Sequence, residues 1–200
     1  MQSRIDNYFA VLNRLICTTE VTDREARRLS LAQGFSMMSE ATHRAHDRGN
    51  KIMFIGNGGS AGIASHLAID FSKNGELRSL TLSDAASLTC IANDLGYENV
   101  FAKQITSHAR EGDVLVAISS SGRSPNILAA TAAARRCHCA IFTFSGFDED
   151  NSLRRSGDLN FYVRSQEYGF VEVAHLSLCH AFLDIDMGWS QASFATSTKR

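Results

Sequence analysis

The segment from Lys51 to Asp70, KIMFIGNGGSAGIASHLAID, constrains the fold of this chain more than any other part of it. It opens with the apolar run 52–55, which is too short for a lone helix and is typical of a buried parallel strand. The stretch 56–60, GNGGS, follows at once, and apolar residues with helical spacing come next. A strand, a glycine-rich turn and a helix in this order direct backbone N–H groups and the positive end of a helix dipole toward an anion. Ser60 is a candidate helix N-cap and a hydroxyl donor to such a ligand.

Two polar side chains lie further along the same predicted helix. His66 and Asp70 are separated by one turn, so they share a face of the helix about 6 Å apart along its axis. An imidazole and a carboxylate placed one turn apart behind an anion-binding loop indicate a catalytic or metal-binding role rather than packing.

A second predicted loop also connects a buried strand to the N-terminus of a helix. The residues 114–118, VLVAI, form the clearest buried strand in the sequence, and SSSGRSP follows at 119–125. Pro125 suits the first helical position, and Ser124 is a natural cap in front of it. Clustered hydroxyls at a helix N-terminus predict a phosphate or oxyanion site, because ligands bind at the carboxyl ends of parallel strands. The alternative is a loop that is merely solvated.

The remaining apolar runs extend the same pattern. Strands are expected at 79–82, 139–144 and 160–163, each separated from the next by helical or turn-rich sequence. Strands that alternate with helices predict an α/β fold with a doubly wound, five-stranded parallel sheet flanked by helices. The length of 200 residues suits one domain, 1–200.

Both ends of the chain are predicted to be helical. Apolar residues at three- and four-residue steps predict a helix over 2–19, and a second one from Thr22 or Asp23 to about His46. We expect these two to form an N-terminal helical hairpin, within 1–49, that packs against other subunits. A last helix is expected from Tyr168 to about Met187, and the polar tail after Trp189 is expected to be frayed.

The composition limits which cellular compartment and which kinds of binding partner we expect for this protein. The net charge of −1 argues against direct nucleic-acid binding, and no apolar stretch approaches the ~18 residues of a membrane span. The N-terminal residues lack the basic start and apolar block of a signal peptide. Five scattered cysteines suit a reducing cytoplasm. The only close cysteine cluster, at 137–139 (CHC), leads into an apolar run and is expected to pack rather than to bind metal.

These motifs together resemble the sugar isomerase (SIS) domain, and more narrowly the phosphoheptose isomerases. The matching segments, spread over most of the chain, are the loop 56–60 with His66, the segment 92–94 (AND), the serine loop 119–124, and His175 with His180. The resemblance implies an aldose–ketose isomerase that converts sedoheptulose 7-phosphate to D-glycero-D-manno-heptose 7-phosphate. It also implies a homotetramer with active sites shared between subunits.

The resemblance further implies a role for each matching residue. The residues expected to bind the sugar phosphate are Ser119, Ser120, Ser121 and Ser124 at the phosphate, and Asn57, Gly58, Gly59, Ser60, Asn93, Asp94 and Glu172 around the sugar. The residues expected to hold a divalent metal, usually zinc, are His66, Asp70, Glu172 and His180. Asp70 and His180 occupy the positions of the acid–base pair.

Two positions depart from the family pattern. Asp70 replaces the usual glutamate and reaches one methylene less far, which would weaken proton transfer at a fixed carbon. Glu172 replaces the usual glutamine, and its charge favours a divalent cation while crowding Asp70. On one helix, Glu172 and His180 would be about 12 Å apart along the axis. They could meet one ion only with extended side chains or from different subunits.

Other interpretations stay open beside this one. The stretch 56–61 also fits the dinucleotide-binding pattern G-x-G-x-x-G/A, and Asp84 follows it at a tolerable distance for a ribose contact. A dinucleotide site would, however, leave the serine loop without a role. A relative without catalysis could bind a phosphosugar or associate with the bacterial replication initiator. Such relatives lack the catalytic carboxylate, whereas Asp70 keeps the charge. His175 faces an apolar stretch and is expected to be a buried structural residue.

Overall fold

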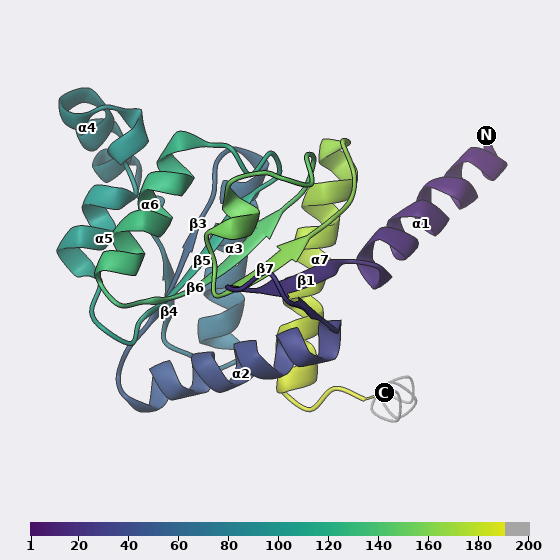
Figure 1. Ribbon diagram of the computed structural model, residues 1–200, viewed down its shortest axis with the longest axis horizontal. Helices are drawn as coiled ribbons and strands as arrows, with labels where there is room; N and C mark the ends of the chain where they lie inside the picture. Colours follow the sequence, from purple (N-terminus) through teal and green to yellow (C-terminus); the bar gives the residue numbers. More distant parts are fainter. Residues whose placement is uncertain (191–200) are drawn as a thin grey trace.

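The computed structural model describes residues 1–190, and these form one mixed sheet between two layers of helices, with one helix projecting away from the body (Figure 1). The polar tail 191–200, for which the sequence predicts fraying, lies outside the described residues. Within the described part of the chain, no helix combines the length and the apolar character that a membrane crossing requires.

The sheet has seven strands in the order β2-β1-β7-β6-β5-β3-β4. Its strands are β1 (Glu20–Asp23), β2 (Arg28–Leu29), β3 (Ile52–Ile55), β4 (Ser79–Thr81), β5 (Val114–Ser119), β6 (Ala140–Ser145) and β7 (Leu159–Tyr162). The strands from β7 to β4 are all parallel, which confirms the predicted five-stranded parallel sheet. The other two are antiparallel additions at the edge beside β7.

Alternation along the central strands divides the core into two halves. In β3, Ile52 and Phe54 pack into one cluster of buried side chains, and Met53 and Ile55 pack into the other. Successive side chains of a strand point to opposite faces, so a run that is apolar throughout needs helices on both sides. The helices α2 (Leu31–Asp47), α3 (Gly59–Lys73) and α7 (Tyr168–Asp186) supply the first cover. The second cover consists of α4 (Ala85–Leu95), α5 (Ala102–His108) and α6 (Pro125–Arg136).

The predicted start of the second helix, at Thr22 or Asp23, is wrong. Residues 20–29 form the β1–β2 hairpin, and α2 begins only at Leu31. The Asp23 carboxylate accepts hydrogen bonds from the backbone N–H groups of Glu25 and Arg27, which holds a turn that competes with a helix. The helix then starts with a capping box between Ser30 and Gln33. The two N-terminal helices are therefore separated by a strand hairpin and are not one helical hairpin.

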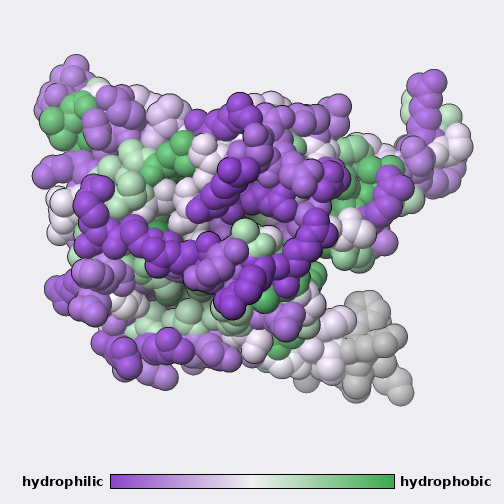
Figure 2. Space-filling model, viewed as in Figure 1, coloured by the Kyte–Doolittle hydropathy of each residue, from purple (hydrophilic) through white to green (hydrophobic). Residues whose placement is uncertain are grey.

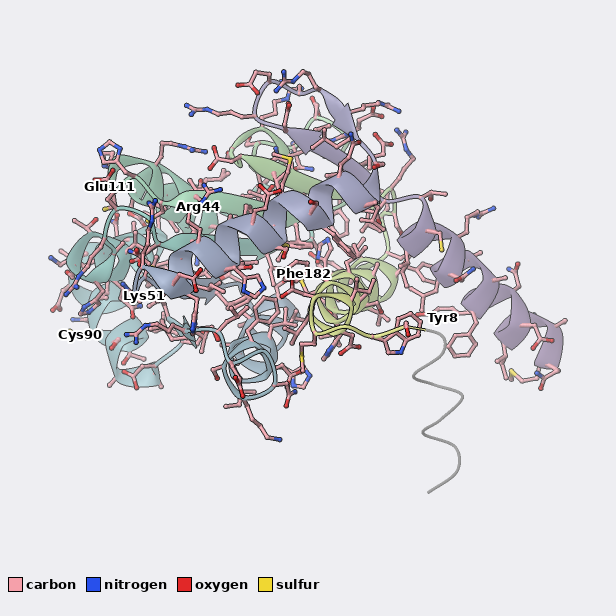
Figure 3. The ribbon with its side chains drawn as sticks, turned by 90° about the horizontal axis from the view of Figure 1, so that it is seen from below. Tyr8, Arg44, Lys51, Cys90, Glu111 and Phe182 are labelled. Carbon is pink, nitrogen blue, oxygen red and sulfur yellow. The ribbon has the colours of Figure 1, made fainter. Side chains whose placement is uncertain are left out.

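The first helix, α1 (Gln2–Cys17), has no buried residue and extends outward from the sheet (Figure 1). Its contact with the body is to α7, where Tyr8 stacks on Phe170 with ring centroids 4.4 Å apart. Figure 3 labels Tyr8 on this projecting helix and Phe182 in the body of the molecule. Phe182 packs against Phe35 of α2. Hydrophobic side chains gather where α1 meets the body (Figure 2). Phe9 of the same helix is 61% exposed.

Two smaller features are the segment after β4 and the cysteine cluster. Helix α4 begins at Ala85, where Asp84 caps it by accepting from the Ser87 N–H, and the short 3-10 turn η1 (Tyr97–Asn99) follows it. In the cysteine cluster, Cys139 is buried and Cys137 packs against the same part of the core, whereas His138 is exposed. Burial raises the pKa of Cys139 to about 12.

Candidate active site

The two predicted loops meet at the carboxyl ends of β3 and β5 and enclose a cleft of about 220 Å³. Its wall contains backbone and hydroxyl groups, one side-chain amide, one carboxylate and one phenol. The lining residues are Asn57, Gly58, Gly59, Ser60, Ser119, Ser120, Ser121, Ser124, Tyr168 and Glu172. Tyr168 was not predicted, because a single tyrosine at the start of an apolar helix gives no signal of its own.

In the first loop, the helix begins two residues earlier than the sequence suggests. Gly58, with φ of 52°, is the N-cap of α3, so Ser60 is not the cap and lies buried in the first turn. A positive φ is accessible to glycine without strain, and it turns the chain sharply from β3 into the helix. The first N–H groups of α3 therefore face the cleft, where a helix N-terminus favours an anion.

The second loop packs closely against the buried residue Asn151. Gly122 has φ of 61°, and a Cβ there would lie 1.9 Å from Asn151 Oδ1, so no larger residue fits. Asn151 is fully buried, and its amide donates to the carbonyl oxygens of Gly146 and Asp148. The Ser120 hydroxyl is also buried and has no hydrogen-bond partner within the described chain. An unpaired buried hydroxyl is costly, and a ligand oxygen in the cleft would satisfy it.

Two hydrogen bonds join the first loop to helix α6, and a third joins it to the turn η1. Asn57 and Asn126 exchange a reciprocal pair of amide hydrogen bonds, of 2.9 Å from Asn57 Nδ2 to Asn126 Oδ1 and 2.8 Å from Asn126 Nδ2 to Asn57 Oδ1. The Tyr97 hydroxyl donates to the same Asn57 oxygen at 3.1 Å. Sequence reasoning missed Asn126 and Tyr97, since neither belongs to a loop motif.

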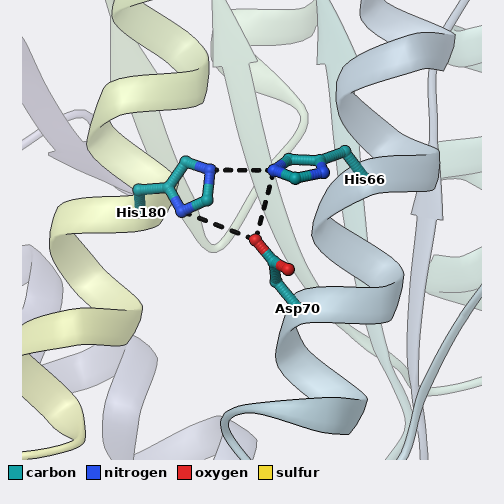
Figure 4. Close-up of side chains that lie close together, drawn as sticks. All are labelled: His66, Asp70 and His180. Carbon is teal, nitrogen blue, oxygen red and sulfur yellow. Dashed lines mark hydrogen bonds and ion pairs between the residues drawn. The ribbon is translucent and has the colours of Figure 1, made fainter.

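The predicted catalytic residues converge between α3 and α7 (Figure 4). His66 Nε2 lies 3.1 Å from His180 Nε2 and 3.2 Å from Asp70 Oδ2, and His180 Nδ1 lies 3.6 Å from the same carboxylate oxygen. Both histidines are partly exposed, and the Asp70 side chain is largely covered. Two imidazoles and one carboxylate with ligand atoms within 4.8 Å of one another form a chemically reasonable set for zinc.

Comparison with known proteins agrees with this geometry. The family model of the SIS domain matches residues 8–146. The chain belongs to the SIS domain family. It is 40% identical over 139 residues to the phosphoheptose isomerase of Solidesulfovibrio magneticus, covering 66% of this chain and 67% of that protein. It is 33% identical over 147 residues to the phosphoheptose isomerase of Citrifermentans bemidjiense, covering 70% and 76%.

A solved structure shows the same relationship across nearly the whole SIS domain. The phosphoheptose isomerase of Neisseria gonorrhoeae superimposes with a TM-score of 0.78 at 30% identity, covering 92% of this chain and 98% of that one. The superimposed part of this chain is longer than the segment 8–146 that the family model matches.

Glu172 does not join the three clustered residues of this SIS domain. Its carboxylate lies against Gly59 at the start of α3, where a Cβ would be 2.5 Å from Oε2. His66 follows Gly59 by seven residues, which corresponds to about 10 Å along the helix axis. The structure thus brings together three of the predicted metal ligands and places the fourth at the cleft.

Asn93 and Asp94 do not line the cleft of the SIS domain. They lie exposed near the end of α4, where Asn93 Nδ2 donates to Asp94 Oδ1 at 2.7 Å. Helix α4 extends to Leu95, so both residues belong to its last turn. Their contact with a sugar stays a prediction.

His175 is the structural residue that its position predicts. It is fully buried in α7, its Nε2 lies 3.1 Å from the Ser145 carbonyl oxygen, and its ring packs edge-on against Phe144. Burial lowers the pKa of His175 to about 4, since the charged imidazolium loses its hydration. The imidazole is therefore neutral at pH 7.

Proposed function

We propose that this protein is an aldose–ketose isomerase that converts sedoheptulose 7-phosphate to D-glycero-D-manno-heptose 7-phosphate. The observation that carries the proposal is the convergence of Asp70 and His180 on helices far apart in sequence, beside a hydroxyl-lined cleft. Membership of the SIS family and similarity to phosphoheptose isomerases support the substrate class.

The cleft suits the phosphate of the substrate. Helices α3 and α6 both begin at it, and their N-terminal dipoles and N–H groups favour an anion. The hydroxyls of Ser119, Ser121 and Ser124 and the unpaired Ser120 hydroxyl supply further hydrogen bonds. Arg123 is not included among the phosphate-binding residues, since its guanidinium pairs with the Asp148 carboxylate at 2.9 Å.

The separation between the cleft and the histidine cluster suits a long substrate. Along α3 the cluster lies about 10 Å beyond Gly59. A phosphate bound at the loops can therefore extend a seven-carbon chain toward Asp70 and His180, with C1 and C2 at the far end. A three-carbon phosphosugar would be too short to place its carbonyl there.

The residues of the cluster match the proton transfers that isomerisation needs. Asp70 takes the proton from C1 of the ketose and returns it to C2. His180 carries a proton from the C1 hydroxyl to the C2 oxygen, so that atoms and charge balance. A positioned acid or base of this kind contributes about 10²–10⁴-fold.

A divalent metal fits the same residues. His66, Asp70 and His180 would hold it, and three protein ligands leave the open fourth position that is typical of a catalytic zinc site. Such an ion would supply Lewis-acid polarisation of the substrate oxygens. The fourth predicted ligand, Glu172, would reach it only after leaving Gly59, or from another subunit.

The assembly and the compartment belong to the same proposal. The exposed apolar side chains of α1 would be covered in a homotetramer, with active sites shared between subunits. The cysteines are all free, which is consistent with the reducing cytoplasm.

A second candidate function is phosphosugar binding without turnover. The shorter arm of Asp70 and the distance of Glu172 from the cluster favour it, because both weaken a site built for proton transfer at a fixed carbon. Such a protein would bind sedoheptulose 7-phosphate and leave it unchanged.

One assay separates the two functions. The purified protein is incubated with sedoheptulose 7-phosphate, with and without a chelator, and formation of the heptose phosphate is followed by NMR. We expect turnover that is lost with the chelator and restored by zinc. Binding measured by calorimetry without any product would support the second candidate, and neither binding nor turnover would refute both.

A further inference from the structure

The contacts of Asn57 suggest how its side chain is used. Its Oδ1 accepts from Asn126 Nδ2 and from the Tyr97 hydroxyl, and its Nδ2 donates to Asn126 Oδ1. Asn57 is the only member of this group that lines the cleft, within the part of the chain that the structure describes. Asn126 is 1% exposed.

A backbone amide determines which way round the two side chains lie. The N–H of Ile127 donates to Asn126 Oδ1 at 3.0 Å. An N–H group cannot accept, so this contact identifies the oxygen of Asn126 and leaves its Nδ2 facing Asn57. Asn57 must then present its oxygen to Asn126 Nδ2, and the Tyr97 hydroxyl adds a second donor to that oxygen.

This arrangement leaves one hydrogen-bonding group of Asn57 unused. The amide NH₂ has two donors, and one is used by Asn126 Oδ1. The oxygen has accepted two hydrogen bonds, which fills its two lone pairs. The remaining N–H is therefore the group that Asn57 offers to a ligand.

We propose that Asn126 and Tyr97 are positioning residues that fix the Asn57 amide as a donor to an oxygen of the bound sugar. This inference rests on the proposed function, in that the ligand is a phosphosugar. A carbonyl or hydroxyl oxygen accepts the hydrogen bond, whereas an ammonium group at the same place would meet another donor. The site thus selects a neutral sugar over an amino sugar at this position.

The test is a double-substitution cycle on the full-length protein. Asn57→Ala, Asn126→Ala and the double variant are compared for sedoheptulose 7-phosphate binding by calorimetry and for kcat and KM. Loss of one neutral hydrogen bond in a binding site weakens ligand affinity by a modest factor. Asn126→Ala should therefore raise KM roughly five- to tenfold with kcat nearly unchanged. In the Asn57→Ala background the same change should cost little, because Asn126 acts through Asn57.

Further variants test the donor assignment and provide the control. Asn57→Asp keeps the shape but removes the donors, so it should bind the sugar no better than Asn57→Ala. Tyr97→Phe should raise KM about twofold. Asn160→Ala removes another buried, hydrogen-bonded asparagine that does not line the cleft, and should lower Tm without changing KM. Binding of inorganic phosphate should be unchanged in all of them.

Two outcomes would overturn the proposal. One is an Asn126→Ala cost that is equal in the wild-type and Asn57→Ala backgrounds. The other is wild-type affinity in Asn57→Asp. Should the wild-type protein not bind the phosphosugar, the proposed function would fall instead. The Asn57 side-chain amide resonances still test the pairing in that case, and unchanged resonances in Asn126→Asp would refute it.

Discussion

The carboxylate of Glu172 lies directly against Gly59, the first residue of α3, so that a Cβ on Gly59 would be 2.5 Å from Glu172 Oε2. This contact joins the start of α7 to the start of α3. It also places a negative charge where the N-terminus of a helix favours one.

Gly59→Ala should therefore weaken substrate binding through Glu172. Alanine favours the helix over glycine by about 0.5–1 kcal/mol, but in the wild-type background it must push the flexible Glu172 side chain aside. We expect little net change in the free energy of unfolding and a loss of phosphosugar affinity. In the Glu172→Ala background, Gly59→Ala should raise Tm. A Gly59→Ala variant that is equally stabilised in both backgrounds would contradict the contact.

The serine loop should bind phosphate without supporting the fold. Ser124 is the N-cap of α6 but makes no side-chain capping bond, and the Ser121 hydroxyl contributes one long contact of 3.3 Å from the Arg123 N–H. The double variant Ser121→Ala/Ser124→Ala should therefore weaken phosphosugar binding while Tm changes little. Ser120→Ala, which removes an unpaired buried hydroxyl, should leave Tm equal or higher and still weaken binding. Calorimetry and thermal unfolding measure both quantities, and unaltered affinity in the double variant would refute the phosphate site.

Asp70 should determine turnover. Asp70→Ala is expected to lower kcat by about 10²–10⁴-fold, since it removes the base. Asp70→Glu should keep or raise kcat, because the longer arm matches the residue usual in the family. Metal content by elemental analysis should fall in Asp70→Ala and not in Asp70→Glu. A metal-free wild-type protein whose activity is insensitive to changes at both Asp70 and His180 would refute this site.

The exposed face of α1 should be covered in solution. Ile5, Tyr8 and Phe9 are all more than 40% exposed, and an apolar patch of this kind is typical of an interface. Light scattering at micromolar concentration should give about four chains. Tyr8→Asp with Phe9→Asp should dissociate the assembly, whereas Asn7→Asp on the same helix should not. A monomeric wild-type protein would contradict the prediction.

His175 should make the fold sensitive to acid. Its pKa is lowered by burial from 6.5 to about 4, so between these values the unfolded chain binds a proton that the folded chain does not. Stability is therefore fully present above about pH 6.5 and falls as the pH drops toward 4, by a few kcal/mol in total. Chemical denaturation across this range measures the loss, and His175→Leu should flatten it. Titration of the His175 ring by NMR near pH 6.5 would contradict the prediction even if that variant does not fold.

The parallel sheet and both loops could be predicted from the amino-acid sequence alone. Apolar runs such as 52–55 and 114–118 are buried on both faces, and only a parallel sheet between helices satisfies them. The glycine and serine stretches that follow are local signals, because turn geometry and helix capping depend on neighbours in the chain. The pairing of His66 with Asp70 is equally local, since one helical turn separates them.

Features that depend on contacts between distant segments could not be predicted in this way. The hairpin at 20–29 forms because β1 pairs with the edge of β7. The sequence EVTDREARRL has no alternating pattern that would predict a strand there. Asn126 became part of the site only when α6 met the first loop at Asn57. Glu172 was separated from His180 by two helical turns, and packing of α7 beside α3 gave each a different neighbour, Gly59 for Glu172 and His66 for His180. Side-chain periodicity fixes which face of a helix is buried, but the register between two helices follows from the packing of the whole core.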